Sequence, residues 1–394
     1  MKFKRIFIIV ADSMGIGNAP DAHLYTDKGA NTFGHIADQF SDFKVSNLAS
    51  LGIGNICQNK TVKSVQNPKA VIARLEEQSV GKDTLTGHFE IMGLKVTEPY
   101  PSFTDTGFPD ELIKKLEDFS ARKVIGNKSA SGTEILVELG EEQLKTGALI
   151  VYTSADSVLQ IAANEEIIPL EELYRICEYA RQITIENKKW QVGRIIARPF
   201  VGKTKETFKR TTNRHDYALK PFAKTALDFL QDAGFDTLAV GKIYDIFDGQ
   251  GISKTTRSKS NYEGMKITIN HLNDDFTGIC FTNLVDFDAL YGHRRDALGY
   301  AECLERFDKK LNLFLEGLKD DDLLILSADH GNDPNHIGTD HTRENVPLLV
   351  YSKSIKNPIN LGISETFADI GCTIADNFNV EQPLIGKSFK NKLQ

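Results

Sequence analysis

The sequence has little of what marks several large classes of protein. Its 394 residues include only 5 cysteines, which are scattered and form no C-x-x-C pair. Neither a thiolate metal site nor a disulfide framework is expected, and unpaired thiols suit a reducing, cytoplasmic location. No stretch approaches the ~18 consecutive apolar residues of a membrane span. We therefore expect a globular cytoplasmic protein with no membrane partner.

Excess positive charge is also absent. Lysine and arginine number 47, aspartate and glutamate number 54, and the net charge is −7. A mildly acidic chain has no general attraction for nucleic acid, and no feature of the sequence indicates a protein partner. A site that binds phosphate would have to obtain its positive charge locally.

Two familiar motifs are present only in part. The apolar run Ile6–Val10 is too short for a secretory signal, which needs about 7–15 apolar residues, so a first β-strand is expected there. Gly15 and Gly17 follow it as in a dinucleotide-binding loop, but Pro20 occupies the place of the third glycine. A nicotinamide cofactor is therefore not expected.

Short apolar runs bounded by Gly, Asp or Pro alternate with helical patterns along the chain. Their nearly continuous apolar character is typical of strands buried on both faces of a parallel sheet. The predicted strands are Arg5–Val10, Leu149–Thr153, Arg194–Ala197, Thr237–Val240, Ile279–Val285, Leu323–Leu326 and Leu348–Tyr351. The predicted helices are Asp110–Phe119, Glu171–Glu186, Pro221–Ala233, Ala297–Leu318 and Glu365–Asn377. This alternation predicts an α/β fold whose mostly parallel sheet is flanked by helices.

Prolines mark two possible domain boundaries. One lies at Pro99 and Pro101, and the other lies in segment 215–221. Candidate metal ligands precede the first boundary and follow the second, and the roughly 120 residues between them have the size of a domain. We predict a metal-binding catalytic core of residues 1–99 and 220–394, with an inserted α/β domain of residues 100–219 that binds substrate.

Aspartates and histidines follow several predicted strands, where ligands bind in open α/β sheets. Mixed Asp and His donors suit divalent ions such as Mn²⁺ or Zn²⁺, and two ions roughly 3.5–4 Å apart can serve an in-line displacement. One such residue alone is usually a cap or a turn residue, but a set of them is hard to explain in that way. The candidate ligands are Asp12, Asp288, His293, Asp329, His330 and His341. Thr339 and Asp340 either hold His341 in place or form only a polar turn.

A second constellation begins at Lys82. The segment Lys82-Asp83-Thr84 precedes a possible helix, and a helix N-terminus is a natural seat for phosphate. Thr84 is either a nucleophile activated by a nearby metal ion or only a helix cap. His88, four residues later on the same helical face, either lines the site or is structural.

The middle third of the chain is locally basic. Ser154 and Asp156 follow a predicted strand and could bind sugar hydroxyls, while arginine can bind phosphate through two hydrogen bonds. Each basic residue alone is best explained as part of a solvated surface, but together they fit a phosphate-binding face. These residues are Arg194, Arg198, Lys203, Lys205, Lys209, Arg210 and Arg214.

Taken together, these motifs resemble the phosphopentomutases of the alkaline phosphatase superfamily over nearly the whole chain. The resemblance rests on IVADSMGIG (9–17), GKDT (81–84), GH (87–88), TNRHDY (212–217), YGHRRD (291–296), ADHG (328–331) and GTDHTRE (338–344). Phe89 departs from the family, which usually has tryptophan there. The resemblance implies an alkaline-phosphatase-like core with an inserted cap domain.

The same resemblance implies roles for individual residues. One Mn²⁺ would be held by Asp288, His293 and His341, and the other by Asp12, Asp329, His330 and the Thr84 oxygen. Thr84 would carry the phosphoryl group. The substrate contacts would be Ser154, Asp156, Arg194, Arg210 and Lys242.

The implied reaction interconverts α-D-ribose 1-phosphate and D-ribose 5-phosphate, or the 2-deoxyribose pair, in nucleoside salvage and pentose catabolism. It would pass through a 1,5-bisphosphate, and a sugar bisphosphate such as glucose 1,6-bisphosphate would activate the enzyme by phosphorylating Thr84. The alternatives are a plain phosphatase, a mutase of the phosphoglycerate type with serine as its nucleophile, and a metal-stabilised binding protein. The C/S-x-P-x-R motif of a sulfatase is absent from the sequence.

Overall fold

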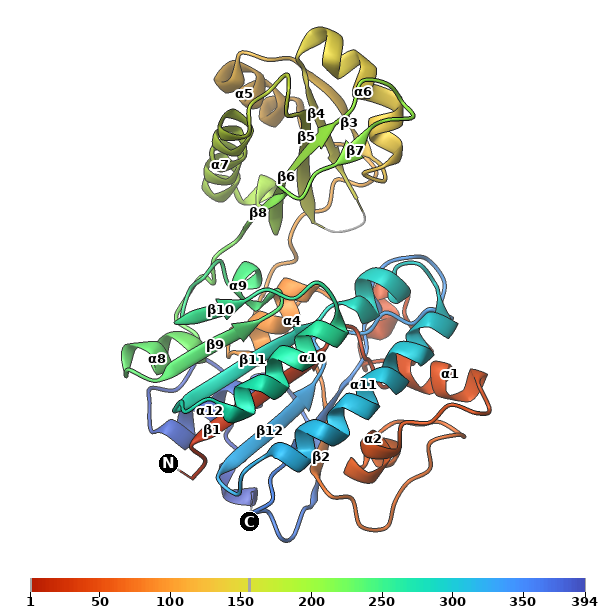
Figure 1. The fold of residues 1–394 in the computed structure, drawn as a ribbon, viewed down its shortest axis with the longest axis vertical. Coiled ribbons are helices and arrows are strands. Elements are labelled where there is room, and N and C mark those ends of the chain that lie inside the picture. Colours follow the sequence, from red (N-terminus) through yellow and green to blue (C-terminus); the bar gives the residue numbers. More distant parts are fainter. Residues whose placement is uncertain (1, 155–156, 394) are drawn as a thin grey trace. The chain divides into compact units, whose positions relative to one another are not determined.

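The computed structural model describes residues 2–154 and 157–393 (Figure 1). The chain divides into two compact units. The first comprises Met1–Glu98 and Pro221–Gln394, and the second comprises Pro99–Lys220. The second unit is thus inserted into the sequence of the first, with boundaries that lie within one residue of the predicted ones.

The first unit contains an eight-stranded sheet in the order β10-β9-β11-β1-β12-β13-β2-β14. Its pairs are parallel except that β13 runs antiparallel to both β12 and β2. The predicted mostly parallel sheet is therefore confirmed. The strands are β1 (Arg5–Ala11), β2 (Val71–Leu75), β9 (Asp236–Val240), β10 (Lys254–Thr256), β11 (Gly278–Leu284), β12 (Asp322–Ser327), β13 (Val346–Tyr351) and β14 (Asn360–Ser364).

Strand β1 lies inside this sheet and is buried along its whole length. Ile8 pairs with Phe281 of β11 on one side and with Ile325 of β12 on the other. Each buried aliphatic side chain of this kind contributes roughly 1.5–3 kcal/mol, which explains the apolar sequence of the strand. Arg5 is buried too, but its guanidinium donates two hydrogen bonds of 2.7 Å to Asp322, so its charge is paired.

Helices flank the sheet, and α10 and α11 lie side by side across one of its faces (Figure 1). The predicted helix at Pro221 begins only at Ala226, because Thr225 and Asp228 form a capping box there. The helices are α1 (Thr32–Gln39), α2 (Ser46–Leu51), α3 (Ile53–Ile56), α4 (Thr84–Ile91), α8 (Ala226–Asp232), α9 (Ile243–Ile246), α10 (Asn261–Asn270), α11 (Ala297–Gly317) and α12 (Asp369–Phe378). Shorter helical turns span η1 (Ala22–Tyr25), η3 (His271–Asn273), η4 (Phe287–Gly292) and η5 (Lys390–Lys392).

The second unit is a smaller α/β structure with its own sheet. Its strand order is β3-β4-β5-β6-β7, and β8 also pairs with β6. The strands are β3 (Val124–Ser129), β4 (Leu149–Thr153), β5 (Val158–Asn164), β6 (Arg194–Val201), β7 (Lys209–Arg210) and β8 (His215–Ala218). The helices are α5 (Asp110–Ser120), α6 (Glu134–Thr146), α7 (Leu170–Glu186) and the turn η2 (Lys188–Trp190).

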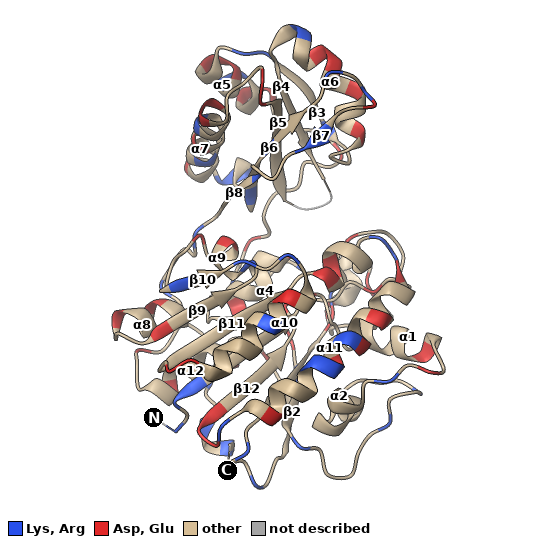
Figure 2. Ribbon diagram, in the orientation of Figure 1, with Lys and Arg blue, Asp and Glu red and all other residues tan. Residues whose placement is uncertain are grey.

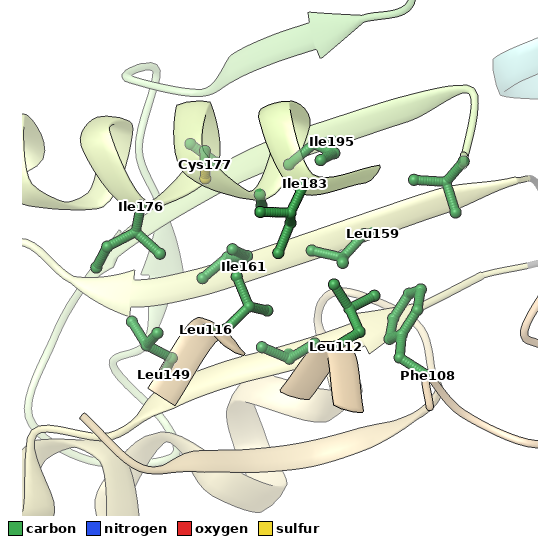
Figure 3. Close-up of a cluster of buried hydrophobic side chains, with 14 of the residues drawn as sticks. Phe108, Leu112, Leu116, Leu149, Leu159, Ile161, Ile176, Cys177, Ile183 and Ile195 are labelled. Carbon is green, nitrogen blue, oxygen red and sulfur yellow. The ribbon is translucent and has the colours of Figure 1, made fainter. Parts of the chain in front are cut away.

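The core of the second unit lies between this sheet and two of its helices. Figure 3 shows Leu112 and Leu116 of α5 and Ile176 of α7 directed at Leu159 and Ile161 of β5. These side chains are fully buried. The second unit therefore has an independent apolar core, as expected of an inserted domain. Across residues 2–154 and 157–393, no helix has both the length and the apolar character needed to cross a lipid bilayer.

Candidate metal centre

Three neighbouring strands end beside candidate ligands. Asp12 follows β1, Asp288 follows β11 within the π-helical turn η4, and Asp329 and His330 follow β12. Because β11, β1 and β12 are adjacent and parallel, their carboxyl ends meet at one edge of the sheet. The topology thus gathers side chains that are far apart in the sequence.

Asp288, His293 and His341 form a first group, whose ligand atoms lie within 4.8 Å of one another. Nε2 of His293 is 3.2 Å from Asp288 Oδ2, and Nε2 of His341 is 3.5 Å from Asp288 Oδ1. Asp288 and His341 are buried, whereas His293 is partly exposed. Solvent therefore reaches this group from the side of His293.

Asp12, Asp329 and His330 form a second group, which is buried throughout. Nε2 of His330 is 3.5 Å from Asp12 Oδ1 and 3.3 Å from Asp329 Oδ2. The ring centroid of His330 lies 4.1 Å from that of His341, so the two groups adjoin. The six candidate ligands thus meet in two groups with the partition that the resemblance implies.

Two atoms that could bind a metal ion have no hydrogen-bond partner. Among the described residues, Asp12 Oδ1 and His341 Nε2 are buried and form no hydrogen bond. An unpaired buried polar atom costs roughly 1–3 kcal/mol, a cost that a bound cation would remove. Carboxylate oxygens combined with imidazole nitrogens are suitable donors for Mn²⁺ or Zn²⁺. The residues present therefore fit two divalent ions.

The electrostatics of the second group also favour a bound cation. Burial, together with the carboxylates of Asp329 and Asp288, raises the pKa of Asp12 to about 7. Burial alone would lower the pKa of His330, but Asp329 and Asp12 outweigh it and raise that pKa to about 9. A bound metal ion would offset the same buried negative charge.

Thr84 is the first residue of α4 and lies beside the second group. Its Oγ1 is 3.2 Å from Nε2 of His330. The helix is capped not by Thr84 but by Asp83, whose side chain accepts hydrogen bonds from the backbone N–H and the hydroxyl of Thr86 at 3.1 and 2.6 Å. The cap alternative for Thr84 is therefore wrong, and its hydroxyl is directed at the candidate ligands.

The turn before His341 supports the first group. His293 Nδ1 donates to the carbonyl oxygen of Thr339 at 2.8 Å, so that its Nε2 faces Asp288. Asp340 Oδ1 accepts a 2.8 Å hydrogen bond from the backbone N–H of His341. Such contacts behind a ligand fix its orientation and its tautomer. Thr339 and Asp340 thus form a turn that also holds two candidate ligands.

Sequence reasoning missed the amides that hold two of the carboxylates. Asn332 donates to Asp288 Oδ1 at 2.7 Å and accepts from Arg295 Nη1 at 2.6 Å. Asn283 donates to Asp12 Oδ2 at 2.9 Å. The position of Asn332 directly after the ADHG segment is a usable signal. Asn283 lies inside the buried strand β11, where the sequence gives no such signal.

The predicted substrate contacts belong to both units. Lys242 is the N-cap residue of α9 in the first unit. In the second unit, Ser154 follows β4 and is partly buried, and Arg194 is the first residue of β6. Asp156 lies outside the described residues.

Arg210 is separated from Arg194 along the sheet of the second unit. It lies in β7 opposite Phe200, six residues beyond Arg194 on β6. At about 3.3 Å per residue, the two backbones are roughly 20 Å apart. Figure 2 shows the basic strand β7 in blue. The predicted phosphate-binding face is thus spread along β6 rather than gathered at one end of it.

A family model described as the Metalloenzyme superfamily matches residues 4–382. The match spans the strands that carry the candidate ligands and the whole of the inserted unit.

Solved structures with a similar fold include three that cover 98% of this chain. PH0037 protein from Pyrococcus horikoshii has 14% identity and a TM-score of 0.47, with 99% of that chain covered. Phosphoglycerate mutase from Leishmania mexicana has 12% identity and a TM-score of 0.44, with 97% covered. The lipoteichoic acid synthase LtaP from Listeria monocytogenes has 11% identity and a TM-score of 0.42, with 74% covered.

Proposed function

The chain belongs to the Metalloenzyme superfamily, and on this premise we propose that it transfers phosphoryl groups with two divalent metal ions and Thr84 as the phosphoryl carrier. The observation that carries the proposal is the position of Thr84 Oγ1, 3.2 Å from Nε2 of His330. At this point the two candidate ligand groups adjoin, since the rings of His330 and His341 are 4.1 Å apart. A hydroxyl beside two such groups is suited to accept a phosphoryl group.

The residues around Thr84 fit this chemistry. As the first residue of α4, Thr84 lies at the positive end of the helix dipole, which favours a bound phosphate. Lys82 adds a positive charge two residues earlier, and its Nζ lies 3.0 Å from Asp27 and 3.4 Å from Asp340. When bound, divalent ions would promote deprotonation of the hydroxyl and neutralise the negative charge of the phosphoryl group.

The finer proposal is a phosphopentomutase reaction, and its support is the sequence resemblance. The bond between phosphorus and Thr84 Oγ1 breaks as a bond forms to O5 of ribose or 2-deoxyribose 1-phosphate, whose 5-hydroxyl loses its proton while Thr84 regains a hydroxyl. The resulting 1,5-bisphosphate turns round and returns its 1-phosphate to Thr84, which releases the pentose 5-phosphate. We propose Mn²⁺ as the metal and a sugar bisphosphate such as glucose 1,6-bisphosphate as the activator.

The inserted unit is proposed to bind the pentose. Ser154 and Arg194 lie near the same edge of its sheet, because Arg194 pairs with Val158 at the start of β5, four residues beyond Ser154. Hydroxyl and guanidinium groups suit a sugar phosphate.

The test is incubation with ribose 1-phosphate, Mn²⁺ and a trace of glucose 1,6-bisphosphate. We expect ribose 5-phosphate as the product. Release of inorganic phosphate instead would identify a phosphatase, and no change in a protein that binds Mn²⁺ would identify a binding protein. Intact mass after exposure to the bisphosphate should show one added phosphoryl group, and the Thr84→Val variant should show none.

A further inference from the structure

His88 is a buried histidine of α4 that none of the steps above uses. It lies one helical turn after Thr84, and its side chain is fully buried. Nδ1 is 2.9 Å from the carbonyl oxygen of Thr84 and 3.2 Å from Oδ2 of Asp329. The ring therefore contacts both the backbone of the candidate nucleophile and one ligand of the second group.

The other ring nitrogen is directed at the amide that holds a second ligand. Nε2 of His88 is 3.4 Å from Nδ2 of Asn283, and the same Nδ2 donates to Asp12 Oδ2 at 2.9 Å. The opposite amide orientation would place the Asn283 oxygen against the Asp12 carboxylate, which is repulsive. Nδ2 can only donate, so Nε2 accepts and carries no proton. The neutral ring then has its proton on Nδ1, where two oxygen atoms lie.

The glycine before His88 brings the helix into contact with the end of β12. A Cβ atom on Gly87 would lie 2.0 Å from the carbonyl oxygen of Asp329, a backbone atom that cannot move aside by rotation. Gly87 thus allows the backbone of α4 to lie close to that of Asp329, and the adjacent His88 forms hydrogen bonds through its ring. The His88 side chain thus contacts α4 and Asp329 and, through Asn283, is linked to Asp12.

We propose that His88, as the Nδ1–H tautomer, is a positioning residue that holds Thr84 and the second ligand group in a fixed relation. The proposal rests on the proposed role of Thr84, but it concerns metal binding and hydrogen bonding that exist without turnover. The ring is not itself a ligand, because Nδ1 donates to oxygen and Nε2 accepts from an amide. The first group, Asp288, His293 and His341, makes no contact with it among the contacts described above.

Three variants separate this role from a merely structural one. His88→Phe keeps a buried ring without hydrogen bonds, and His88→Asn keeps an N–H donor near the position of Nδ1. The matched control is His271→Phe, which removes another buried histidine whose Nδ1 lies 2.7 Å from the carboxylate of Asp274.

Calorimetric titration with Mn²⁺ gives the first readout. We expect two ions for the unaltered protein and for His271→Phe. In His88→Phe one ion should bind as before and the other about 10–100-fold more weakly, the usual effect of removing a contact behind a ligand. His88→Asn should recover part of that loss. Unchanged binding of both ions by a folded His88→Phe variant would overturn the proposal.

Nitrogen NMR of the unaltered protein gives a second readout, which does not depend on the folding of any variant. With ¹⁵N-labelled histidine and Zn²⁺ in place of paramagnetic Mn²⁺, the His88 signals should show a protonated Nδ1 and an unprotonated Nε2. A protonated Nε2 would exclude the assigned tautomer. If both readouts agree with expectation while ribose 1-phosphate is not converted, the positioning role stands and only the proposed reaction fails.

Discussion

Arg343 has one of the largest fully buried side chains in the described part of the protein. It donates to both carboxylate oxygens of Asp21 at 3.0 and 2.9 Å, to the carbonyl oxygen of Gly81 at 2.7 Å, and to the Glu77 carboxylate. Burial raises the pKa of Glu77, while the guanidinium opposes that rise. Arg343 thus ties the segment after His341 to the loop that precedes α4.

Arg343→Met should therefore lower the free energy of unfolding by about 3–5 kcal/mol, because it leaves the Glu77 carboxylate buried without its partner. Urea unfolding followed by circular dichroism measures the change. The matched control is Arg306→Met, whose partner Glu302 lies across an exposed helix turn, and a change of about 0–1 kcal/mol is expected there. Equal effects of the two variants would contradict this view of Arg343.

Thr84 allows a prediction that separates chemistry from metal binding. Thr84→Val should abolish phosphoryl transfer, because no hydroxyl remains at 3.2 Å from His330, while metal content by elemental analysis stays close to that of the unaltered protein. Thr86→Val is the control: it loses the 2.6 Å bond to Asp83 and about 1 kcal/mol of stability but keeps the candidate nucleophile. Transfer activity retained by Thr84→Val would remove Thr84 from the mechanism.

The candidate ligands could be chosen from the sequence because each is an Asp or His close behind an apolar run or inside a short polar motif. The amides could not be chosen in this way. Asn283 has its role only because β11 lies beside β1, which brings its Nδ2 to 2.9 Å from Asp12. For the same reason, the sequence could not decide whether His88 lines the site or is structural. Helical spacing places His88 beside Thr84 but does not reveal its contact with Asp329.

At the scale of the element, α4 depends on the absence of a side chain at Gly87. We expect Gly87→Ala to displace the helix from the end of β12, since the new Cβ would meet a backbone oxygen at 2.0 Å. Stability should fall by about 1–3 kcal/mol, as in other overpacked sites. One of the two metal ions should also bind more weakly, because Thr84 and His88 move with the helix. Thermal unfolding and metal titration measure the two effects.

A second helical glycine provides the control for that prediction. Gly317 ends α11, and a Cβ there would meet only the tip of the Leu272 side chain, which can rotate away. Gly317→Ala should be neutral or stabilising by up to about 1 kcal/mol, the difference in helix propensity. If Gly87→Ala behaved in the same way, close packing of α4 would not be what positions Thr84.

The elements found from the sequence are those with long apolar runs or clear helical periodicity. β1, β4, β11 and β12 agree with the predicted strands to within one or two residues. β5 was missed although it is buried throughout, because Gln160 and Asn164 interrupt its apolar character. Gln160 accepts a 2.9 Å hydrogen bond from Arg198, a tertiary contact that propensity does not contain. The edge strand β10 has only three residues, and β14 is mostly exposed and has no apolar run.

At the scale of the whole molecule, the insertion of one unit into the other was readable from prolines and from the position of the candidate ligands. The antiparallel direction of β13 could not be predicted from the sequence, because an apolar run does not indicate the direction of its strand. Substrate binding by the inserted unit stays a prediction. The two units have separate cores, so their stabilities can be measured separately if a probe belongs to one of them.

Trp190, the single tryptophan, is such a probe, because it is buried in the core of the second unit. Burial would raise the pKa of Asp216 in the same unit, but its hydrogen bond to Arg214, with further help from Arg194, lowers that pKa below its usual value. Asp216 therefore contributes stability above its unfolded pKa of about 3.9, and this contribution is lost as the pH falls through the lower folded value.

We therefore expect the unfolding midpoint reported by Trp190 fluorescence to fall as the pH decreases below about 5 and through the folded pKa of Asp216, more steeply in the unaltered protein than in Asp216→Asn. The expected difference is about 1 kcal/mol, because solvent reaches Arg214 and weakens the pair. Asp232→Asn, which breaks an exposed pair with Lys224 in the first unit, should leave the tryptophan signal unchanged. Identical acid profiles for Asp216→Asn and the unaltered chain would mean that this ion pair does not stabilise the inserted unit, whose resistance to acid would then reside in its apolar core.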